Sequence, residues 1–154
     1  MDYKKSEAKE YAREHLVGVW AANLTPFDDD LRIDEKAYRE NLDHWIKDLQ
    51  LGGLFIAGKQ AEFFSMSIPE RKRLMELSVE AAQAAGDRGG IGRCGIITSC
   101  SDTNLDVVLE LARYSQDIGA DYVIVHSPVL HFGADTDETI YEYYRHLSEK
   151  IDIG

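Results

Sequence analysis

The chain has 154 residues, enough for one domain with a hydrophobic core. Its 17 Lys and Arg against 28 Asp and Glu give a formal net charge of −11, which disfavours nucleic-acid binding because phosphate recognition needs a basic surface. No apolar run approaches the roughly 20 residues of a membrane span, and the charged N-terminus lacks the apolar stretch of a signal peptide. We therefore expect a cytoplasmic protein with neither nucleic-acid nor membrane partners.

The N-terminal third predicts a helix, a strand and a second helix. Residues 3–16 are charged with sparse apolar positions and predict a short N-terminal helix. The apolar run 19–24 predicts the first strand. From about 34 to 50 the apolar residues recur on one face of a helix, which indicates that this helix packs against a core.

The second strand and its loop are the most informative stretch. Two glycines precede the apolar residues 54–56, as in a strand covered on both faces, and Gly58 is expected to end it with backbone angles that a side chain disfavours. Ser67 and Glu70 form a capping box that begins the next helix, which Gly86 ends.

The same alternation continues to the C-terminus. Residues 94–98 predict a third strand, followed by a helix capped by Thr103. Residues 122–125 predict a fourth strand, followed by a helix whose capping box is Asp135 with Glu138.

Four strand–helix units in succession predict an α/β fold with a parallel sheet and right-handed crossovers. A self-contained doubly wound domain is an alternative. That fold places a glycine-rich phosphate loop after its first strand, whereas residues 25–28 contain no glycine and end on an aspartate.

Several segments carry a resemblance to a known family: T-P-F at 25–27, G-K-Q-A-E at 58–62 with M-S-I-P-E-R at 66–71, S-C-S-D-T-N-L at 99–105, G-A-D at 119–121 and S-P-V-L at 127–130. They resemble, in order, T-P-F, G-T/S-T-G-E with L-S-x-x-E-R, G-x-G-x-N-x-T, G-A-D and T-P-Y-Y. These are motifs of the pyruvate-dependent aldolases that include dihydrodipicolinate synthase and N-acetylneuraminate lyase.

The resemblance implies a (β/α)8 TIM barrel, of which residues 17–154 supply the first four units after an N-terminal helical extension, residues 1–16. It also implies class I aldolase chemistry, in which a neutral lysine attacks the carbonyl of pyruvate and the imine stabilises a carbanion. The family needs neither metal nor organic cofactor. Its lysine comes from the sixth strand, which this chain does not contain, so we expect the chain to be inactive alone.

The site residues implied by the resemblance depart from the family pattern. The hydroxyl pair that would hold a keto-acid carboxylate is Lys59 and Gln60 here, and the proton-shuttling tyrosine is Leu130, which has no proton to move. Thr25 and Glu62 are expected to support the site rather than to catalyse. The candidates for substrate binding are Thr25, Lys59, Gln60, Glu62, Ser99, His126 and His131, of which five, Thr25, Lys59, Glu62, Ser99 and His126, should gather at the carboxyl ends of the strands.

Other interpretations of these residues stay open. Lys59 is either an anion contact, a replacement Schiff-base lysine, or a solvated or Glu-paired side chain. Glu62, His126 and His131 have ligand chemistry but no metal-binding spacing, so we predict no metal. In the alternative reading Glu62 accepts backbone N–H groups of its own loop and His126 caps a strand.

Two functions follow. The first is a dihydrodipicolinate synthase-like, pyruvate-dependent carbon–carbon lyase of which this chain is the N-terminal half. The second is a non-catalytic half-barrel that binds a small anion or keto acid or serves as an assembly piece. In either case the apolar first and fourth strands are unprotected edges, which predicts a homo-oligomer that pairs them.

Overall fold

The computed structural model describes residues 3–89, 92–127 and 136–154. The predicted alternation of strands and helices is confirmed. The elements are a 3₁₀ turn Lys5–Glu7, α1 Ala8–His15, β1 Trp20–Ala22, α2 Glu35–Asp43 with a π-helical turn His44–Asp48, β2 Gly53–Ile56, a 3₁₀ turn Phe63–Ser65, α3 Ile68–Ala85, β3 Gly95–Ser99, α4 Leu105–Ile118, β4 Tyr122–Ile124 and α5 Asp137–Lys150.

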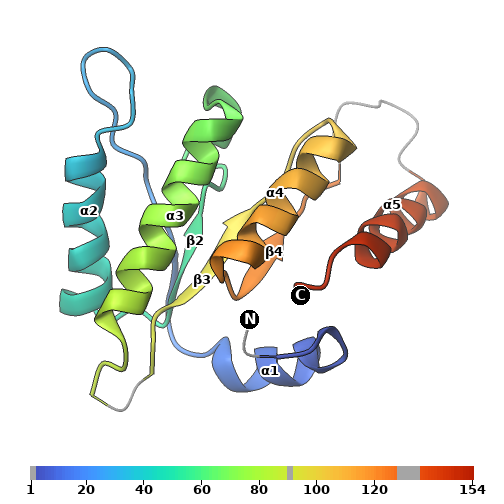
Figure 1. The fold of residues 1–154 in the computed structure, drawn as a ribbon, viewed down its shortest axis with the longest axis horizontal. Helices are drawn as coiled ribbons and strands as arrows, with labels where there is room; N and C mark the ends of the chain where they lie inside the picture. The colour runs from blue at the N-terminus through green and yellow to red at the C-terminus, as the bar shows by residue number, and fades with distance from the viewer. Residues whose placement is uncertain (1–2, 90–91, 128–135) are drawn as a thin grey trace.

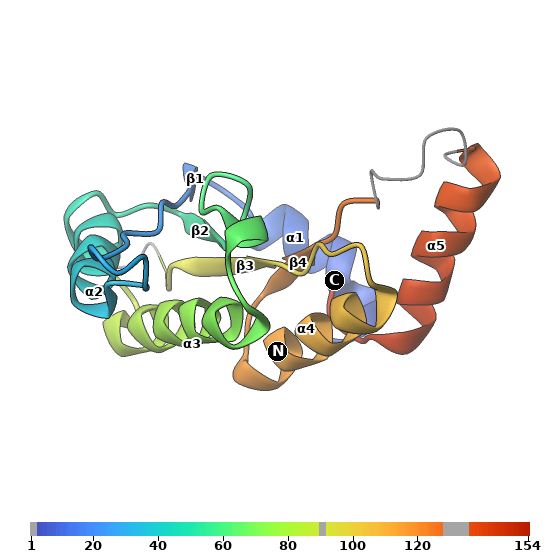
Figure 2. The same cartoon turned by 90° about the horizontal axis from the view of Figure 1, so that it is seen from above.

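The strands form one parallel sheet in the order β1-β2-β3-β4, as predicted. Helices α2, α3 and α4 cover one face of this sheet (Figures 1 and 2). Among the described residues, β1 and β4 are therefore its two edges. No helix in the described part of the chain is long and apolar enough to cross a membrane.

Strand alternation decides which side chains enter the core. Leu54 and Ile96 are partners in the register and belong to the buried cluster beneath the helices, together with Leu74 of α3 and Leu111 of α4. The side chains at the other positions of the strands face away from the helices. Phe55 and its register partners Ala22 and Ile97 are examples, and they are only half-buried or exposed.

On that second face, the indole of Trp20 lies across the neighbouring strands. Trp20 is in register with Gly53, which is in register with Gly95. A Cβ at Gly53 would lie 2.2 Å from the indole, and one at Gly95 would lie 2.3 Å from it. Because glycines alone leave room for this ring, one side chain covers the amino-terminal end of three strands.

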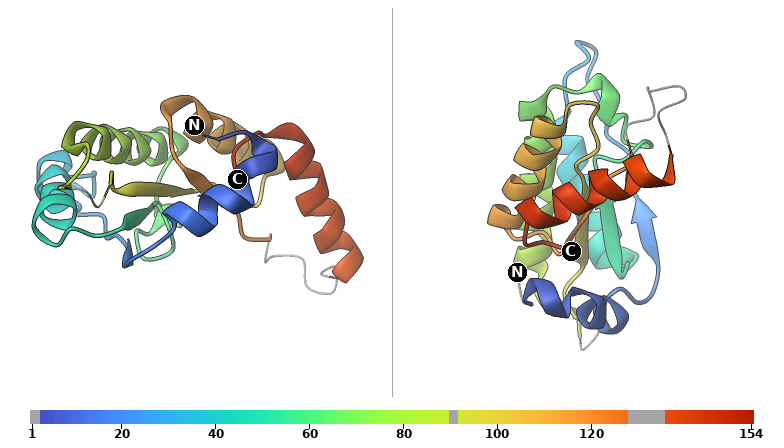
Figure 3. Two further views of the ribbon diagram at one scale, coloured as in Figure 1. Left: turned by 90° about the horizontal axis from the view of Figure 1, so that it is seen from below. Right: turned by 90° about the vertical axis from the view of Figure 1, so that its right-hand side faces the viewer.

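Helix α1 lies across the amino-terminal end of the sheet (Figure 3). Tyr122 of β4 donates its hydroxyl to the carbonyl of Ala8 at 2.7 Å, and the ring of Tyr3 stacks on that of Tyr122 at 5.3 Å. The N-terminal residues are thus tied to the start of β4.

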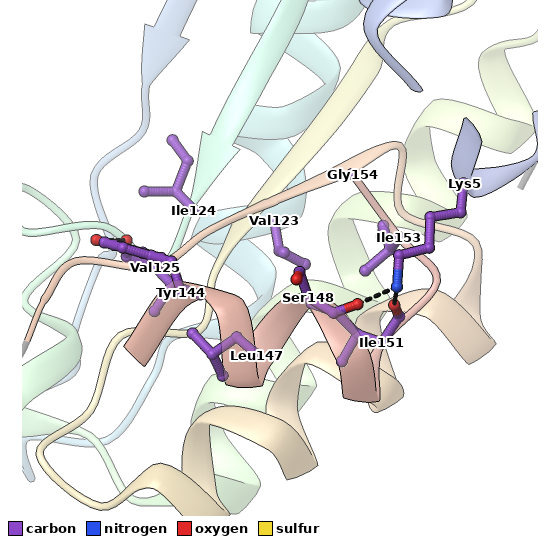
Figure 4. A pocket seen from close by; sticks show the side chains of 10 residues that line it. All are labelled: Lys5, Val123, Ile124, Val125, Tyr144, Leu147, Ser148, Ile151, Ile153 and Gly154. Atoms are coloured by element: carbon purple, nitrogen blue, oxygen red, sulfur yellow. Dashed lines mark hydrogen bonds between the residues drawn. The ribbon is translucent and has the colours of Figure 1, made fainter. Parts of the chain in front are cut away.

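An apolar groove of about 560 Å³ runs between β4 and α5 (Figure 4). Its walls include Val123 and Val125 on one side and Leu147 and Ile151 on the other. The edge of β4 is not wholly open, because the N–H of Val123 donates to the carbonyl of Gly154 at 3.0 Å.

Two expectations at the ends of elements need correction. Ala57, not Gly58, adopts the left-handed conformation after β2, with φ 53°. Gly58 is required by space instead, since a Cβ there would lie 2.8 Å from the ring of Phe55. The helix after β3 is capped by Asn104, whose side chain accepts the N–H of Asp106, rather than by Thr103.

The predicted cap of the last helix is also corrected in part. Asp135 lies outside the described residues. The capping box is formed by Thr136 and Thr139, one residue further along than Asp135 with Glu138. The helix predicted for 34–50 is present, but its last turn is π-helical.

We predict that Gly53→Ala lowers the free energy of unfolding by about 1–3 kcal/mol, because the new methyl group overlaps the indole of Trp20. Urea denaturation measures the change. In a Trp20→Ala background the same substitution should cost clearly less. An equal cost in both backgrounds would show that the indole is not the reason for the glycine.

Candidate ligand-binding site

The described residues that follow the four strands gather at one edge of the sheet (Figure 1). Because all strands are parallel, Thr25, Lys59, Glu62, Ser99 and His126, which follow or end the four strands, come to this carboxyl edge. Gln60 is beside Lys59 in the same turn. His131 and Leu130 lie outside the described residues.

The first two loops are joined by a hydrogen bond. Thr25 donates its hydroxyl to the carbonyl of Ala61 at 3.1 Å. Ala61 is buried and closes a tight turn, in which its N–H donates to the carbonyl of Gly58 at 3.1 Å. Lys59 and Gln60 are exposed at the tip of this turn. Thr25 therefore supports the turn that presents them.

The environment of Lys59 favours a solvated side chain over one paired with a glutamate. Its side chain is exposed, and within residues 3–89, 92–127 and 136–154 its ammonium forms no ion pair. A lysine in this position is free to meet an anion that approaches the carboxyl edge.

Glu62 supports its loop through its backbone rather than its carboxylate. It has left-handed backbone angles, φ 60° and ψ 40°, and its N–H donates to the carbonyl of Lys59 at 3.1 Å. Its own carbonyl accepts the N–H of Ser65 at 2.9 Å. The carboxylate is exposed and accepts no backbone N–H among the described residues, so that part of the expectation is wrong.

Arg71 at the start of α3 connects the second and third loops. It is 1% exposed, and one guanidinium nitrogen donates to the carbonyl of Ser101 at 2.8 Å and to that of Ser99 at 3.3 Å. A second nitrogen lies 3.1 Å from the carboxylate of Asp102, and the guanidinium carbon is 5.0 Å from the ring centre of Phe63. Burial lowers the pKa of Arg71, and the Asp102 carboxylate opposes this shift.

Ser101 connects the third and fourth loops. Its Oγ lies 2.8 Å from Nδ1 of His126 and accepts the backbone N–H of His126 at 3.0 Å. The hydroxyl of Ser99 donates to the same Oγ at 3.4 Å. Ser99 and His126 are both candidates from the sequence. They are therefore linked through Ser101, which the sequence analysis did not single out.

Arg71 and Ser101 are thus the residues that sequence reasoning missed. Arg71 is the arginine of the motif M-S-I-P-E-R at 66–71. In the sequence it looks like any polar residue in the first turn of a helix. Ser101 stands at the second glycine of the G-x-G pattern. The available signal was a serine hydroxyl where the family pattern has glycine. The neighbouring sequence does not show which residue that hydroxyl contacts.

Cys100 lies in the same loop but faces the core. Its sulfur is 3.6 Å from the hydroxyl of Ser115 on α4, and burial raises the pKa of its thiol to about 11. Such a thiol is a poor nucleophile near neutral pH. The described residues contain no group of three or more His, Cys, Asp or Glu that could hold a metal ion.

Comparison with known proteins gives a consistent result. The profile of the dihydrodipicolinate synthetase family matches residues 15–153. The N-acetylneuraminate lyase of Clostridium perfringens is 30% identical over 137 residues, which are 89% of this chain and 44% of that protein.

Solved structures agree. CdNal from Clostridium difficile, in complex with mannosamine, has a TM-score of 0.78 at 26% identity and matches 88% of this chain and 43% of its own. The N-acetylneuraminate lyase of Fusobacterium nucleatum complexed with pyruvate has a TM-score of 0.72 at 26% identity and matches 86% of this chain and 41% of its own.

A parallel sheet of βα units with its polar loops at the carboxyl edge is the architecture of a TIM barrel, and this chain forms about half of one. The chain belongs to the dihydrodipicolinate synthetase family. It spans less than half the length of the curated relatives that it matches, in their N-terminal portion. The predicted family and fold are both confirmed.

We predict that Arg71→Gln lowers the free energy of unfolding by about 2–4 kcal/mol, because it leaves buried carbonyls without donors and removes the partner of Asp102. Arg73→Gln is the matched control on the same helix. Arg73 pairs with Glu35 and Glu76 at the surface, where its side chain is 39% exposed, so its loss should cost less than about 1 kcal/mol. Equal urea midpoints for the two variants would contradict the role assigned to Arg71.

Proposed function

We propose that this chain is the keto-acid-binding N-terminal half of a pyruvate-dependent carbon–carbon lyase, and that alone it binds the acid without reacting with it. The observation that carries this proposal is the turn of residues 58–62. It presents the exposed ammonium of Lys59, which forms no ion pair with the described residues, at the carboxyl edge, where proteins of this barrel class place their chemistry. A relative of similar fold is complexed with pyruvate, which supports a keto acid as the ligand.

The residues at this edge suit recognition better than covalent chemistry. Lys59 offers a positive charge for a carboxylate, and Gln60 offers amide donors beside it. Carbanion formation beside a carbonyl needs an electron sink, which in class I aldolases is an imine with a placed lysine. The imine itself is that sink, so the proposed chemistry requires no metal or organic cofactor.

A second function remains a candidate on the same observation. An exposed lysine attracts any small anion, so a non-catalytic half-barrel that binds anions is consistent with the turn as well. The two proposals differ in whether a keto group matters to binding and in whether any lysine of the chain forms an imine.

Borohydride trapping with pyruvate separates these cases. We expect the intact mass to stay unchanged, because no lysine here is placed and desolvated as a Schiff-base nucleophile must be. A trapped adduct on Lys59, lost in Lys59→Ala, would contradict this expectation and make Lys59 the nucleophile.

Binding is measured separately by NMR titration with pyruvate. Lys59→Ala should weaken binding by about three- to tenfold, as the loss of one partly solvated charge contact does. Lys47→Ala is the control, since Lys47 lies at the end of the π-helical turn and pairs with Asp43 at 2.7 Å. Equal affinity for acetate and pyruvate would favour the anion-binding function, and no binding of either would overturn both.

We further propose that two copies of this 154-residue chain associate through their sheet edges. The β1 side exposes apolar side chains, with Val17 57%, Val19 68% and Leu24 62% exposed. The β4 side has the apolar groove beside α5. Two parallel edges of one chain suit each other around a two-fold axis, with β1 of one copy beside β4 of the other. The bond from Val123 to Gly154 must open for full pairing.

Light scattering tests this association, and we expect twice the mass of the chain at micromolar concentration. Val19→Lys should shift it toward monomer, because a charge placed directly before the edge strand β1 opposes pairing. Leu31→Lys, at an 81% exposed position in the turn after β1, should leave the mass unchanged. A wild-type chain that stays monomeric with a cooperative melt would contradict the proposal.

A further inference from the structure

The contacts of the Ser101 hydroxyl indicate which nitrogen of the His126 imidazole carries the proton. The Oγ of Ser101 has two acceptor positions. One is filled by the backbone N–H of His126 at 3.0 Å, and the other by the hydroxyl of Ser99 at 3.4 Å. The hydrogen of Ser101 is therefore left for Nδ1 of His126, at 2.8 Å. In the neutral imidazole, Nδ1 is then the acceptor and Nε2 carries the N–H.

Ser101 itself is not placed to attack a ligand. It is 5% exposed, and its oxygen is already occupied by two donors. Its carbonyl is held by the buried guanidinium of Arg71 at 2.8 Å, so the backbone that carries the hydroxyl is fixed as well. Ser101 is a positioning residue for the imidazole.

His126, by contrast, is accessible. It is half-buried and follows β4 at the carboxyl edge. Within residues 3–89, 92–127 and 136–154, no group forms a hydrogen bond to its Nε2. The charged groups close to this loop, Arg71 and Asp102, lie 3.1 Å apart and pair with each other. The imidazole thus has Nδ1 held by Ser101, whereas Nε2 has no hydrogen-bond partner in the part of the chain that the structure describes.

Cys100 explains why the two serines share a side. It packs into the core against Ser115, and in extended chain its neighbours Ser99 and Ser101 then point to the opposite face. Ile124, the register partner of Ser99, and His126, two residues later, follow the same alternation. Ser101 and His126 thus lie on the side of the sheet that α2, α3 and α4 leave uncovered.

We propose that the Ser101–His126 pair presents the Nε2–H group of His126 as a fixed hydrogen-bond donor to a carboxylate or carbonyl oxygen of a small keto acid at the carboxyl ends of β3 and β4. The ligand class rests on the proposed function, whereas the tautomer does not. Because Ser101 sets the tautomer before the ligand arrives, the donor needs no rearrangement on binding, which favours affinity.

Nitrogen-15 NMR of the imidazoles tests the pair directly. The chain has five histidines, and His126→Gln assigns the signal of interest by its disappearance. At mildly alkaline pH, where an ordinary imidazole is neutral, we expect His126 to show a bare Nδ1 and a protonated Nε2. Ser101→Ala should give a mixture of tautomers. Ser115→Ala removes another buried serine hydroxyl, which bonds Thr98 instead, and should leave the His126 signal unchanged.

Pyruvate is then added to the labelled chain. We expect Nε2 of His126 to shift on binding, and Ser101→Ala to weaken binding by about three- to tenfold. A protonated Nδ1, or a His126 that does not respond while the amides of residues 58–62 do, would overturn the proposal and leave the keto-acid function standing. No response from any residue would overturn the keto-acid function together with this one.

Discussion

The buried guanidinium of Arg71 is the interaction on which the carboxyl edge depends. Parallel strands end in loops whose carbonyls have no ladder partners, and buried carbonyls without donors are costly. Arg71 supplies donors to two of them, at Ser99 and Ser101, from the first turn of α3. The positive charge of Arg71 is balanced by Asp102. Its contacts thereby hold the loop after β3 against the first turn of α3.

The four loops form a connected series because of this arrangement. Thr25 holds the turn at Ala61, the same loop continues to Phe63 against Arg71, and Arg71 fixes the backbone of Ser101, which in turn holds His126. The three hydrogen bonds of this series join segments far apart in the sequence, and the contact of Phe63 with Arg71 joins the loop after β2 to the helix that follows it. A ligand that contacts Lys59 and His126 would meet groups placed by one continuous set of contacts rather than by independent loops.

The sequence was a good guide to the elements and a poorer one to their contacts. Apolar periodicity and the Ser67–Glu70 capping box depend on near neighbours in the chain, so the alternation of strands and helices and the start of α3 could be predicted. The choice between Thr103 and Asn104 as cap depends on where β3 ends, which tertiary packing decides. Arg71 and Ser101 were missed because their partners are about 30 and 25 residues away, beyond any local pattern.

The indole of Trp20 has a consequence for the depth of the site. It covers Gly53 and Gly95 at the amino-terminal end of the sheet, so that level of the uncovered face is already filled by a single ring. TIM barrels stack their interior side chains in successive layers. Here the indole fills the lowest layer over β1, β2 and β3, so a ligand that contacts the polar groups of the loops lies above this ring, nearer the carboxyl edge.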